Sequence, residues 1–373
     1  MNCMNSCQQS IVNYKKKTAG YTQLGSGLTS YVSTIYALDA EHVYIGGGFA
    51  SASSITVNNI TMWNGITPNF YPLSTGLNGA VSAIYALSSS QVYIGGKFTD
   101  AGNANGDRIT MWNGTTQTFA ALGSGIGGVN SYVNAIYALD ADHVYIGGNF
   151  SNVGSTNGDG IIRWNGTTTQ TFTALGSGIS ALSTYVNAIY ALDADHVYIG
   201  GNFSNIGSTN GDRITMWNGT TQIFTALGSG IGGVNTYVNA IYALDADHVY
   251  IGGNFPSAGG ISANNITMWN GTTQTFTALG SGVSGGSTSV NAIYALDETH
   301  VYIGGIFTSA GGTTVNNITM WNGTTQTFTA LGAGVNGTVN SIHALDNTHV
   351  YIGGTFTSAG GDTSIKYITM WNG

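Results

Sequence analysis

One stretch of sequence recurs along the whole chain and limits what the chain can fold into. It is VNAIYALDADHVYIGGNF at residues 133–150, and near-copies begin at Val32, Val81, Val186, Val238, Val290 and Val339. A segment ending in Trp-Asn-Gly follows each of the seven copies, and successive tryptophans lie 49 to 53 residues apart. A repeat of this length with four short β-like segments is typical of a propeller blade. The sequence therefore predicts an all-β fold, a seven-bladed β-propeller with four antiparallel strands in each blade.

The unit at residues 133–175 shows how the four strands are predicted. The first is residues 133–139, which we expect to line the central channel, and the second is residues 144–148. A longer loop leads to the third strand, residues 161–164, and the outer strand runs through Phe172 and Leu175. β-Branched and aromatic residues fill these segments, while Asp-rich and Asn-Gly turns separate them. The pair Gly147-Gly148 indicates a close approach between backbones of neighbouring blades.

The repeat pattern begins and ends in the middle of a unit. YTQLGSG, starting at Tyr21, matches the FTALGSG that closes later units, whereas the chain stops at Trp371-Asn372-Gly373, the end of a third strand. The N-terminal strand is therefore predicted to complete the last blade and close the ring, which would leave no open sheet edge. We assign residues 21–373 to the propeller and residues 1–20 to an N-terminal extension. That extension is either a flexible end or an anchor inserted into a partner assembly.

Charge and cysteine content exclude several classes of function. From Tyr21 onward there are five basic and sixteen acidic side chains, and so acidic a body repels phosphate backbones and argues against nucleic-acid binding. Both cysteines, Cys3 and Cys7, lie in the extension, so neither a disulfide nor a Cys/His metal cluster is expected in the propeller. No apolar run approaches the roughly 18 residues of a membrane span, and the extension lacks the apolar core of a signal peptide. These features favour a protein that is cytoplasmic or assembled into a particle, with an extracellular surface as the alternative.

Two known repeat families resemble these units. The run VYIGG, then a loop, then Trp112 followed seven residues later by Phe119 resembles the kelch repeat, although the order of the two aromatic types is reversed. The phrase GGNF…ITMWNG…ALGSGV is similar to the propeller repeats of Rax2-type cell-surface proteins and of their giant-virus and bacterial relatives. The resemblance covers residues 21–373. It implies a propeller fold with a scaffold or binding role, and it implies nothing about a ligand.

An Asp-x-x-His motif precedes the second strand in six of the seven units. Its members are Asp39 with His42, Asp140 with His143, Asp193 with His196, Asp245 with His248, Asp297 with His300, and Asp346 with His349. A ring of carboxylates and imidazoles could bind divalent cations or respond to pH. Alternatively, each motif is an Asx-type turn in which the aspartate accepts backbone N–H groups. We favour the turn, because histidines of neighbouring blades lie too far apart to share one metal easily, and we expect no metal site.

The recurring tryptophan also has two interpretations, and two residues depart from the repeat. In propeller lectins an aromatic side chain in each blade stacks on a sugar, whereas a tryptophan on a blade strand is more often packed between sheets. We favour the packed core. Arg163 occupies a position where the other units have methionine, and His343 occupies the position of Tyr137. Either departure could be a local function or sequence drift, and we favour drift.

The function predicted from these patterns is binding without catalysis. Neither H-E-x-x-H nor a P-loop motif is present in the sequence, so we expect neither an enzyme nor a cofactor. The first hypothesis is a structural or protein-binding scaffold, associated with a surface or a particle. The alternative is a multivalent glycan-binding lectin, which a glycan array would reveal.

Loop lengths predict which face would bind a partner. The Asp-x-x-His turn and the Trp-Asn-Gly turn hardly vary in length, whereas the other two connections vary freely. Since strand direction alternates, the two constant turns share one rim and the two variable loops share the other. Variable loops on a rigid scaffold often carry function. The candidate partner-binding residues on the variable rim are Asp107, Arg108, Asp159, Asp212 and Arg213. The rival explanation is drift of unconstrained loops.

Overall fold

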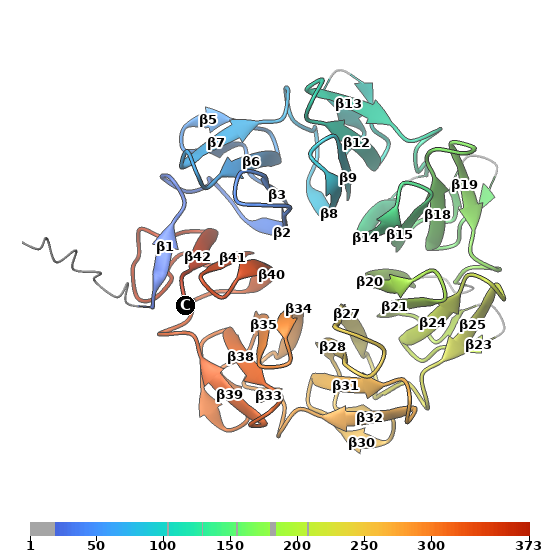
Figure 1. Ribbon diagram of the computed structural model, residues 1–373, viewed down its shortest axis with the longest axis vertical. Helices are drawn as coiled ribbons and strands as arrows, with labels where there is room; N and C mark the ends of the chain where they lie inside the picture. The colour runs from blue at the N-terminus through green and yellow to red at the C-terminus, as the bar shows by residue number, and fades with distance from the viewer. Residues whose placement is uncertain (1–18, 103, 129, 154–155, 180–183, 207–208) are drawn as a thin grey trace, which may run out of the picture.

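The computed structural model confirms a seven-bladed propeller. It describes residues 19–102, 104–128, 130–153, 156–179, 184–206 and 209–373, so the predicted extension lies almost wholly outside the described residues. Seven four-stranded antiparallel sheets surround a central channel (Figure 1). The described residues contain strands and turns only, and they include no helix long and apolar enough to cross a membrane.

Every blade has the same strand order, from the channel outward. The inner strands are β2 (Val32–Ala37), β8 (Val81–Ser88), β14 (Tyr132–Asp140), β20 (Tyr185–Asp193), β27 (Tyr237–Ala243), β34 (Ser289–Asp297) and β40 (Val339–Asp346). The second strands are β3 (Val43–Gly47), β9 (Gln91–Gly96), β15 (His143–Asn149), β21 (His196–Asn202), β28 (Val249–Asn254), β35 (His300–Ile306) and β41 (His349–Gly354). The third strands are β6 (Ile60–Asn64), β12 (Ile109–Asn113), β18 (Ile161–Asn165), β24 (Ile214–Asn218), β31 (Ile266–Asn270), β38 (Ile318–Asn322) and β42 (Ile368–Trp371). The outer strands are β7 (Asn69–Pro72), β13 (Thr118–Ala121), β19 (Thr171–Ala174), β25 (Ile223–Ala226), β32 (Thr275–Ala278), β39 (Thr327–Ala330) and β1 (Tyr21–Gln23).

The hydrophobic core lies between blades. The second strand of each blade is buried on both faces, as the burial of Val144, Tyr145 and Ile146 shows. Each cluster of buried side chains combines two neighbouring blades; one of them joins Tyr145 of the third blade to Val186 and Trp217 of the fourth. Stacked sheets that bury both faces explain why these strands are apolar throughout and do not alternate.

The Gly-Gly pair of each second strand permits this close stacking. A Cβ atom added at Gly147 would overlap the side chain of Val186 in the next blade, which confirms the predicted close approach between blades. A Cβ at Gly148 would instead overlap the backbone oxygen of Tyr132 on the inner strand of the same blade. The two glycines therefore relieve two different contacts, one between blades and one within a blade.

The N-terminal strand completes the last blade, as predicted. β1 pairs antiparallel with β42, and Tyr21 lies opposite Trp371 with ring centroids 5.0 Å apart. The Tyr21 hydroxyl donates to the backbone oxygen of Leu331 in the sixth blade at 2.8 Å. In Figure 1, β1 lies on the outside of the blade formed by β40, β41 and β42. The first and last described strands thus belong to one sheet.

The loop between the second and third strands is more ordered than the sequence indicated. Residues 149–160 were predicted to be a loop, but they contain the two-residue strands β16 (Asn152–Val153) and β17 (Thr156–Asn157), which pair with each other. Equivalent hairpins are β4 (Ser51–Ala52) with β5 (Ile55–Thr56), β10 (Asp100–Ala101) with β11 (Ala104–Asn105), β22 (Asn205–Ile206) with β23 (Thr209–Asn210), β29 (Ser257–Ala258) with β30 (Ile261–Ser262), and β36 (Ser309–Ala310) with β37 (Thr313–Thr314). Two of these hairpins gain a third strand: β26 (Ile231–Gly232) pairs with β29, and β33 (Val283–Ser284) pairs with β36. Segments this short carry too little alternation to be recognised in sequence.

Candidate functional site

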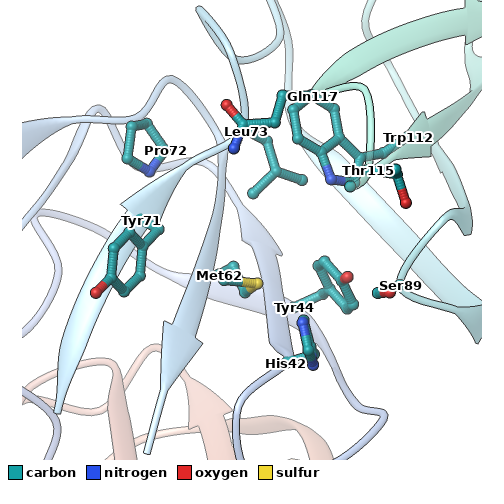
Figure 2. A pocket seen from close by; sticks show the side chains of 11 residues that line it. His42, Tyr44, Met62, Tyr71, Pro72, Leu73, Ser89, Trp112, Thr115 and Gln117 are labelled. Carbon is teal, nitrogen blue, oxygen red and sulfur yellow. The ribbon is translucent and has the colours of Figure 1, made fainter. Parts of the chain in front are cut away.

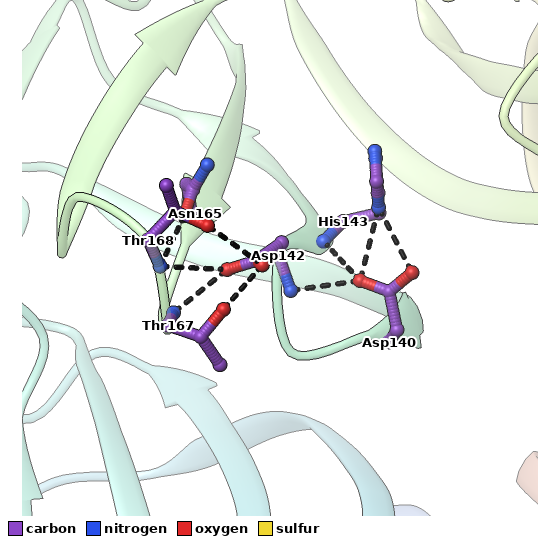
Figure 3. Close-up of polar contacts among 6 residues, drawn as sticks. All are labelled: Asp140, Asp142, His143, Asn165, Thr167 and Thr168. Carbon is purple, nitrogen blue, oxygen red and sulfur yellow. Dashed lines mark hydrogen bonds and ion pairs between the residues drawn. The ribbon is translucent and has the colours of Figure 1, made fainter.

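The Asp-x-x-His motifs form Asx turns, as the sequence favoured. In the third blade the Asp140 carboxylate accepts hydrogen bonds from the backbone N–H groups of Asp142 and His143 at 2.8 and 2.9 Å (Figure 3). Nδ1 of His143 lies 2.9 Å from the same carboxylate. The other five motifs pair their aspartate and histidine in the same way, at 2.9 to 3.1 Å. Within the described residues, no group of three His, Cys, Asp or Glu side chains could hold a metal ion.

A second carboxylate joins the two constant turns of a blade. Asp142 accepts hydrogen bonds from the backbone N–H and the hydroxyl of Thr167, which lies in the turn between the third and outer strands (Figure 3). These two contacts lower the pKa of Asp142 to about 2. Asp195 contacts Thr220 in the same way. The two constant turns therefore share one rim, here called the Asp–His rim, and the other face of the ring is the variable rim.

The turn aspartates predict a loss of stability in acid. Partial burial raises the pKa of Asp140, but hydrogen bonds from the His143 side chain and from backbone N–H groups outweigh that effect, so its pKa lies below the ordinary value. The aspartates of the other five motifs are shifted in the same direction. A carboxyl whose pKa is lowered by folding stabilises the fold above its unfolded pKa, about 3.9, and that stabilisation is lost as the pH falls through the folded value.

We expect the melting temperature to fall steeply below about pH 4, since six such groups titrate there. Replacing Asp193 and Asp245 by Asn together should make that fall shallower, because Asn is neutral at every pH. Calorimetric scans between pH 2 and pH 7 measure both effects. An unchanged melting temperature at pH 3 would contradict the assignment.

The tryptophans belong to the core. Six of them are 5–7 % exposed, and each packs against the phenylalanine opposite it on the outer strand, as Trp112 does on Phe119 with centroids 4.8 Å apart. Trp371 has Tyr21 in that place. Faces buried in this way cannot form the repeated sugar-stacking platforms that the alternative interpretation required.

The channel is lined by tiers of side chains from the inner strands. Six tyrosines and His343 form a closed ring in which neighbouring centroids are 4.6 to 5.0 Å apart; the tyrosines are Tyr36, Tyr85, Tyr137, Tyr190, Tyr242 and Tyr294. Burial lowers the pKa of His343 to about 3, so this histidine is a neutral member of the ring at pH 7. Toward the variable rim, Asn134, Asn187, Asn239 and Asn291 form a chain of side-chain amide hydrogen bonds of 3.0 Å. His343 and these amides form hydrogen bonds to neighbouring residues, so they stabilise the inner strands around the channel.

The predicted partner-binding residues lie on the variable rim, but two of them also hold loops in place. Arg108 donates to the backbone oxygens of Ser131 and Gly128 at 3.2 and 3.0 Å, and so fixes the connection to the next blade. Arg213 makes the corresponding contact with Thr236 at 3.4 Å. Their side chains are only 17 and 20 % exposed, and each lies near the preceding aspartate. Asp159, which precedes a glycine, has no such arginine beside it.

Sequence reasoning did not identify the exposed apolar side chains on this rim. Tyr31 and Val234 lie on connections between blades, and Val234 is 89 % exposed. Ile261 lies in the β29–β30 hairpin, and Ile306 ends β35. The sequence shows that these residues are apolar, but it does not distinguish them from the apolar loop residues that are buried in the core.

The Nε atom of Arg163 lacks a hydrogen-bond partner among the described residues. It lies opposite Tyr145 in the register of β15 and β18, where the other blades pair tyrosine with methionine. Within the described part of the chain, both its Nε and the Tyr145 hydroxyl are buried without a hydrogen-bond partner. A buried donor without a partner costs about 1–3 kcal/mol.

Arg163→Met should therefore raise the free energy of unfolding by about 1 kcal/mol, because it removes the unpaired donor and restores the residue of the other blades. Urea unfolding followed by circular dichroism measures the change, with Met216→Leu in the next blade as a control of similar volume. A clear destabilisation by Arg163→Met would show that the guanidinium has a partner.

The fold and its repeats define the class of this protein as a β-propeller, and the comparisons with known proteins narrow it. The family model of the Rax2 C-terminal beta propeller domain matches residues 10–126 and 268–372, together more than half of the chain. The chain belongs to this family. A search of curated proteins found no match.

Solved structures share the fold at low sequence identity. The WD40 beta propeller domain of Doa1 is 14 % identical, with a TM-score of 0.57 over 95 % of this chain and 97 % of that one. The computationally designed Ika8 protein is 17 % identical, with a TM-score of 0.55 over 94 % of this chain and 100 % of that one. The extracellular domain of a hybrid two-component system from B. thetaiotaomicron is 12 % identical, with a TM-score of 0.63 over 94 % of this chain but only 39 % of its own length. At such identities the likeness establishes the fold alone.

Proposed function

We propose that this propeller is a non-catalytic scaffold that binds a partner protein on its variable rim. The observation that supports the proposal most is that four of the seven exposed large apolar side chains among the described residues lie on that rim, namely Tyr31, Val234, Ile261 and Ile306, and that Val234 is the most exposed of the seven. Exposed apolar patches rimmed by polar residues mark protein interaction sites, whereas single exposed apolar residues are normal, so the substitutions below test whether these side chains act together. The Asp–His rim, in contrast, is tied together by hydrogen bonds between its constant turns.

Charged groups on the same rim supply a second element of recognition. Asp107 and Asp212 are 28 and 30 % exposed, and in both cases the neighbouring arginine is engaged with backbone oxygens. With Asp159 they place carboxylates on three successive blades, the second to the fourth. We infer that the partner contributes basic or hydrogen-bond-donating groups opposite these carboxylates and apolar groups opposite Val234 and Ile261.

The test compares two pairs of substitutions whose average side-chain exposure is similar. Val234→Asp with Ile261→Asp alters the variable rim, whereas Ile66→Asp with Ile223→Asp alters residues at the other rim that are 63 and 58 % exposed. Proteins captured from the native source by the unmodified chain should be lost with the first pair and retained with the second. Asp107→Lys with Asp212→Lys should weaken capture of the same proteins, and both arginines are left intact because they hold loops.

Three outcomes decide the proposal. If only the Val234→Asp and Ile261→Asp pair abolishes protein capture, and its melting temperature is unchanged, the result supports docking on the variable rim. Loss with the second pair alone would move the site to the Asp–His rim. Avid signals on a glycan array without protein capture would favour the lectin alternative.

A further inference from the structure

A cavity of about 430 Å³ lies between the first and second blades, on the Asp–His rim and away from the proposed docking face. Its first-blade side is formed by Tyr44, Met62, Tyr71, Pro72 and Leu73, with His42 at its edge (Figure 2). The second blade contributes Ser89, Trp112, Gly114, Thr115 and Gln117. The cavity falls within the range of about 300–1,000 Å³ that is usual for small-ligand sites.

This junction departs from the repeat at the residues that shape the cavity. Tyr71 lies opposite Met62 in the strand register, where the second blade has Ala120 opposite Met111. Ser89 belongs to the one inner turn that lacks the Asp-x-x-His motif. At the next junction the corresponding cavity is smaller, about 310 Å³, and is lined by Ala120, Ala121 and Ala141. The first junction thus combines an aromatic outer wall with a neutral turn.

Tyr44, which lines the cavity, carries a hydrogen-bond donor without a partner in the described part of the chain. Tyr44 is 0 % exposed, and no described residue bonds to its hydroxyl. In Figure 2 this hydroxyl points toward the side of the cavity where Ser89 lies. Burial and the nearby Asp39 carboxylate raise the pKa of Tyr44 to about 12, so the phenol keeps its proton. Tyr93, the corresponding residue at the next junction, does not have a buried hydroxyl without a partner. A buried donor without an acceptor lowers the stability of the fold, and a ligand that supplies an acceptor restores the missing hydrogen bond.

We propose that this cavity binds an uncharged aromatic ring that carries a hydrogen-bond acceptor, such as a phenol. The apolar side chains of Met62, Tyr71 and Leu73 suit a flat apolar body, and methionine sulfur makes favourable contacts with aromatic rings. None of the lining residues is a carboxylate, lysine or arginine, and the one imidazole, that of His42, is already paired with the Asp39 carboxylate, so the lining favours an uncharged ligand. A sugar would bring several hydroxyls against the apolar side of the cavity, where they would lose hydrogen bonds to water. The Tyr44 hydroxyl donates to the acceptor of the ring.

The ring could belong to a free small aromatic compound or to a tyrosine side chain of a polypeptide, and two probes distinguish these sources. p-Cresol represents the free compound, and N-acetyl-L-tyrosinamide represents the polypeptide. Titration calorimetry of the full chain with each probe should detect binding. Tighter binding of the amide supports a polypeptide source, and tighter or equal binding of p-cresol supports a free compound. Toluene, which lacks the acceptor, should bind several-fold more weakly than p-cresol.

A matched pair of variants tests the location. Tyr44→Phe should weaken p-cresol binding about fivefold to tenfold, since one buried hydrogen bond is lost. Tyr93→Phe makes the same change one junction away and should leave the affinity unchanged. Tyr71→Ala, which copies the second blade, should also weaken binding. A melting temperature within 2 °C of the unmodified chain would show that the variants fold.

Absence of p-cresol binding, equal loss with Tyr44→Phe and Tyr93→Phe, or displacement of p-cresol by methyl β-D-glucoside would overturn the proposal. The Val234→Asp variant provides a separate control. It should keep p-cresol binding even where it loses the partner protein, so failure of this site and failure of the docking rim are distinguishable.

Discussion

A chain that lacks residues 1–27 should unfold far below the melting temperature of the full chain, or aggregate, because it loses the outer strand of its last blade. Tyr21 packs on Trp371 and against the core between the sixth and seventh blades, and Leu24, 2 % exposed, belongs to the core between the last and first blades. Losing the burial of Leu24 alone costs about 1.5–3 kcal/mol, and the loss of the half-buried Tyr21 adds to it. The deletion also leaves the edge of β42 unpaired, and an open edge favours aggregation.

Deletion of residues 1–16 is the matched control, since it leaves β1 intact. Its melting temperature should lie close to that of the full chain in the same calorimetric scan. Equal melting temperatures for the two deletions would contradict ring closure by the N-terminal strand.

Gly147→Ala should be among the most destabilising single substitutions in this protein. The added methyl group would overlap the Val186 side chain, which is 0 % exposed and cannot move into free space. Forcing extra volume into a packed core costs about 1–3 kcal/mol, and here the whole junction between the third and fourth blades has to shift. Gly148→Ala should cost at least as much, because its methyl group would meet backbone and not a side chain.

Gly127→Ala provides the comparison, since a Cβ there meets nothing within 4 Å. Chemical unfolding of the three variants should give losses for Gly147→Ala and Gly148→Ala and a value near zero for Gly127→Ala. Similar values for all three would mean that the blades are less closely stacked than the structure indicates.

The sequence predicted the fold so well because each unit repeats the same local rules seven times. The alternation of apolar strands with Asp-rich and Asn-Gly turns identified four strands per blade, and the mid-unit start at Tyr21 predicted the closure that pairs it with Trp371. The hairpins such as β16–β17 were missed because two-residue strands have no recognisable period. The Asx turn was expected, but the hydrogen bond that Thr167 donates to Asp142 was not, since it joins residues whose proximity only the fold establishes.

The binding features were harder to predict, for a different physical reason. Arg108 and Arg213 were predicted from the sequence as partner-binding residues, and each donates a hydrogen bond to a backbone oxygen of a neighbouring loop. The cavity of the first junction is lined by Tyr71 and Ser89, which come from different blades. Its third feature is the Tyr44 hydroxyl, which has no hydrogen-bond partner among the described residues. A residue that differs from the repeat can be identified in the sequence, but its contacts with the neighbouring blade determine its role.

The most direct test of a ring closed by its own N-terminal strand is amide hydrogen exchange at β1. Asn372 donates its backbone N–H to Gly20, and the Thr369 hydroxyl donates to the backbone oxygen of Thr22, so the pairing extends along the strand. Peptides that cover residues 19–24 should exchange as slowly as those that cover β13, the outer strand of the second blade. Complete exchange of residues 19–24 at the earliest time point, with β13 still protected, would contradict the closed ring.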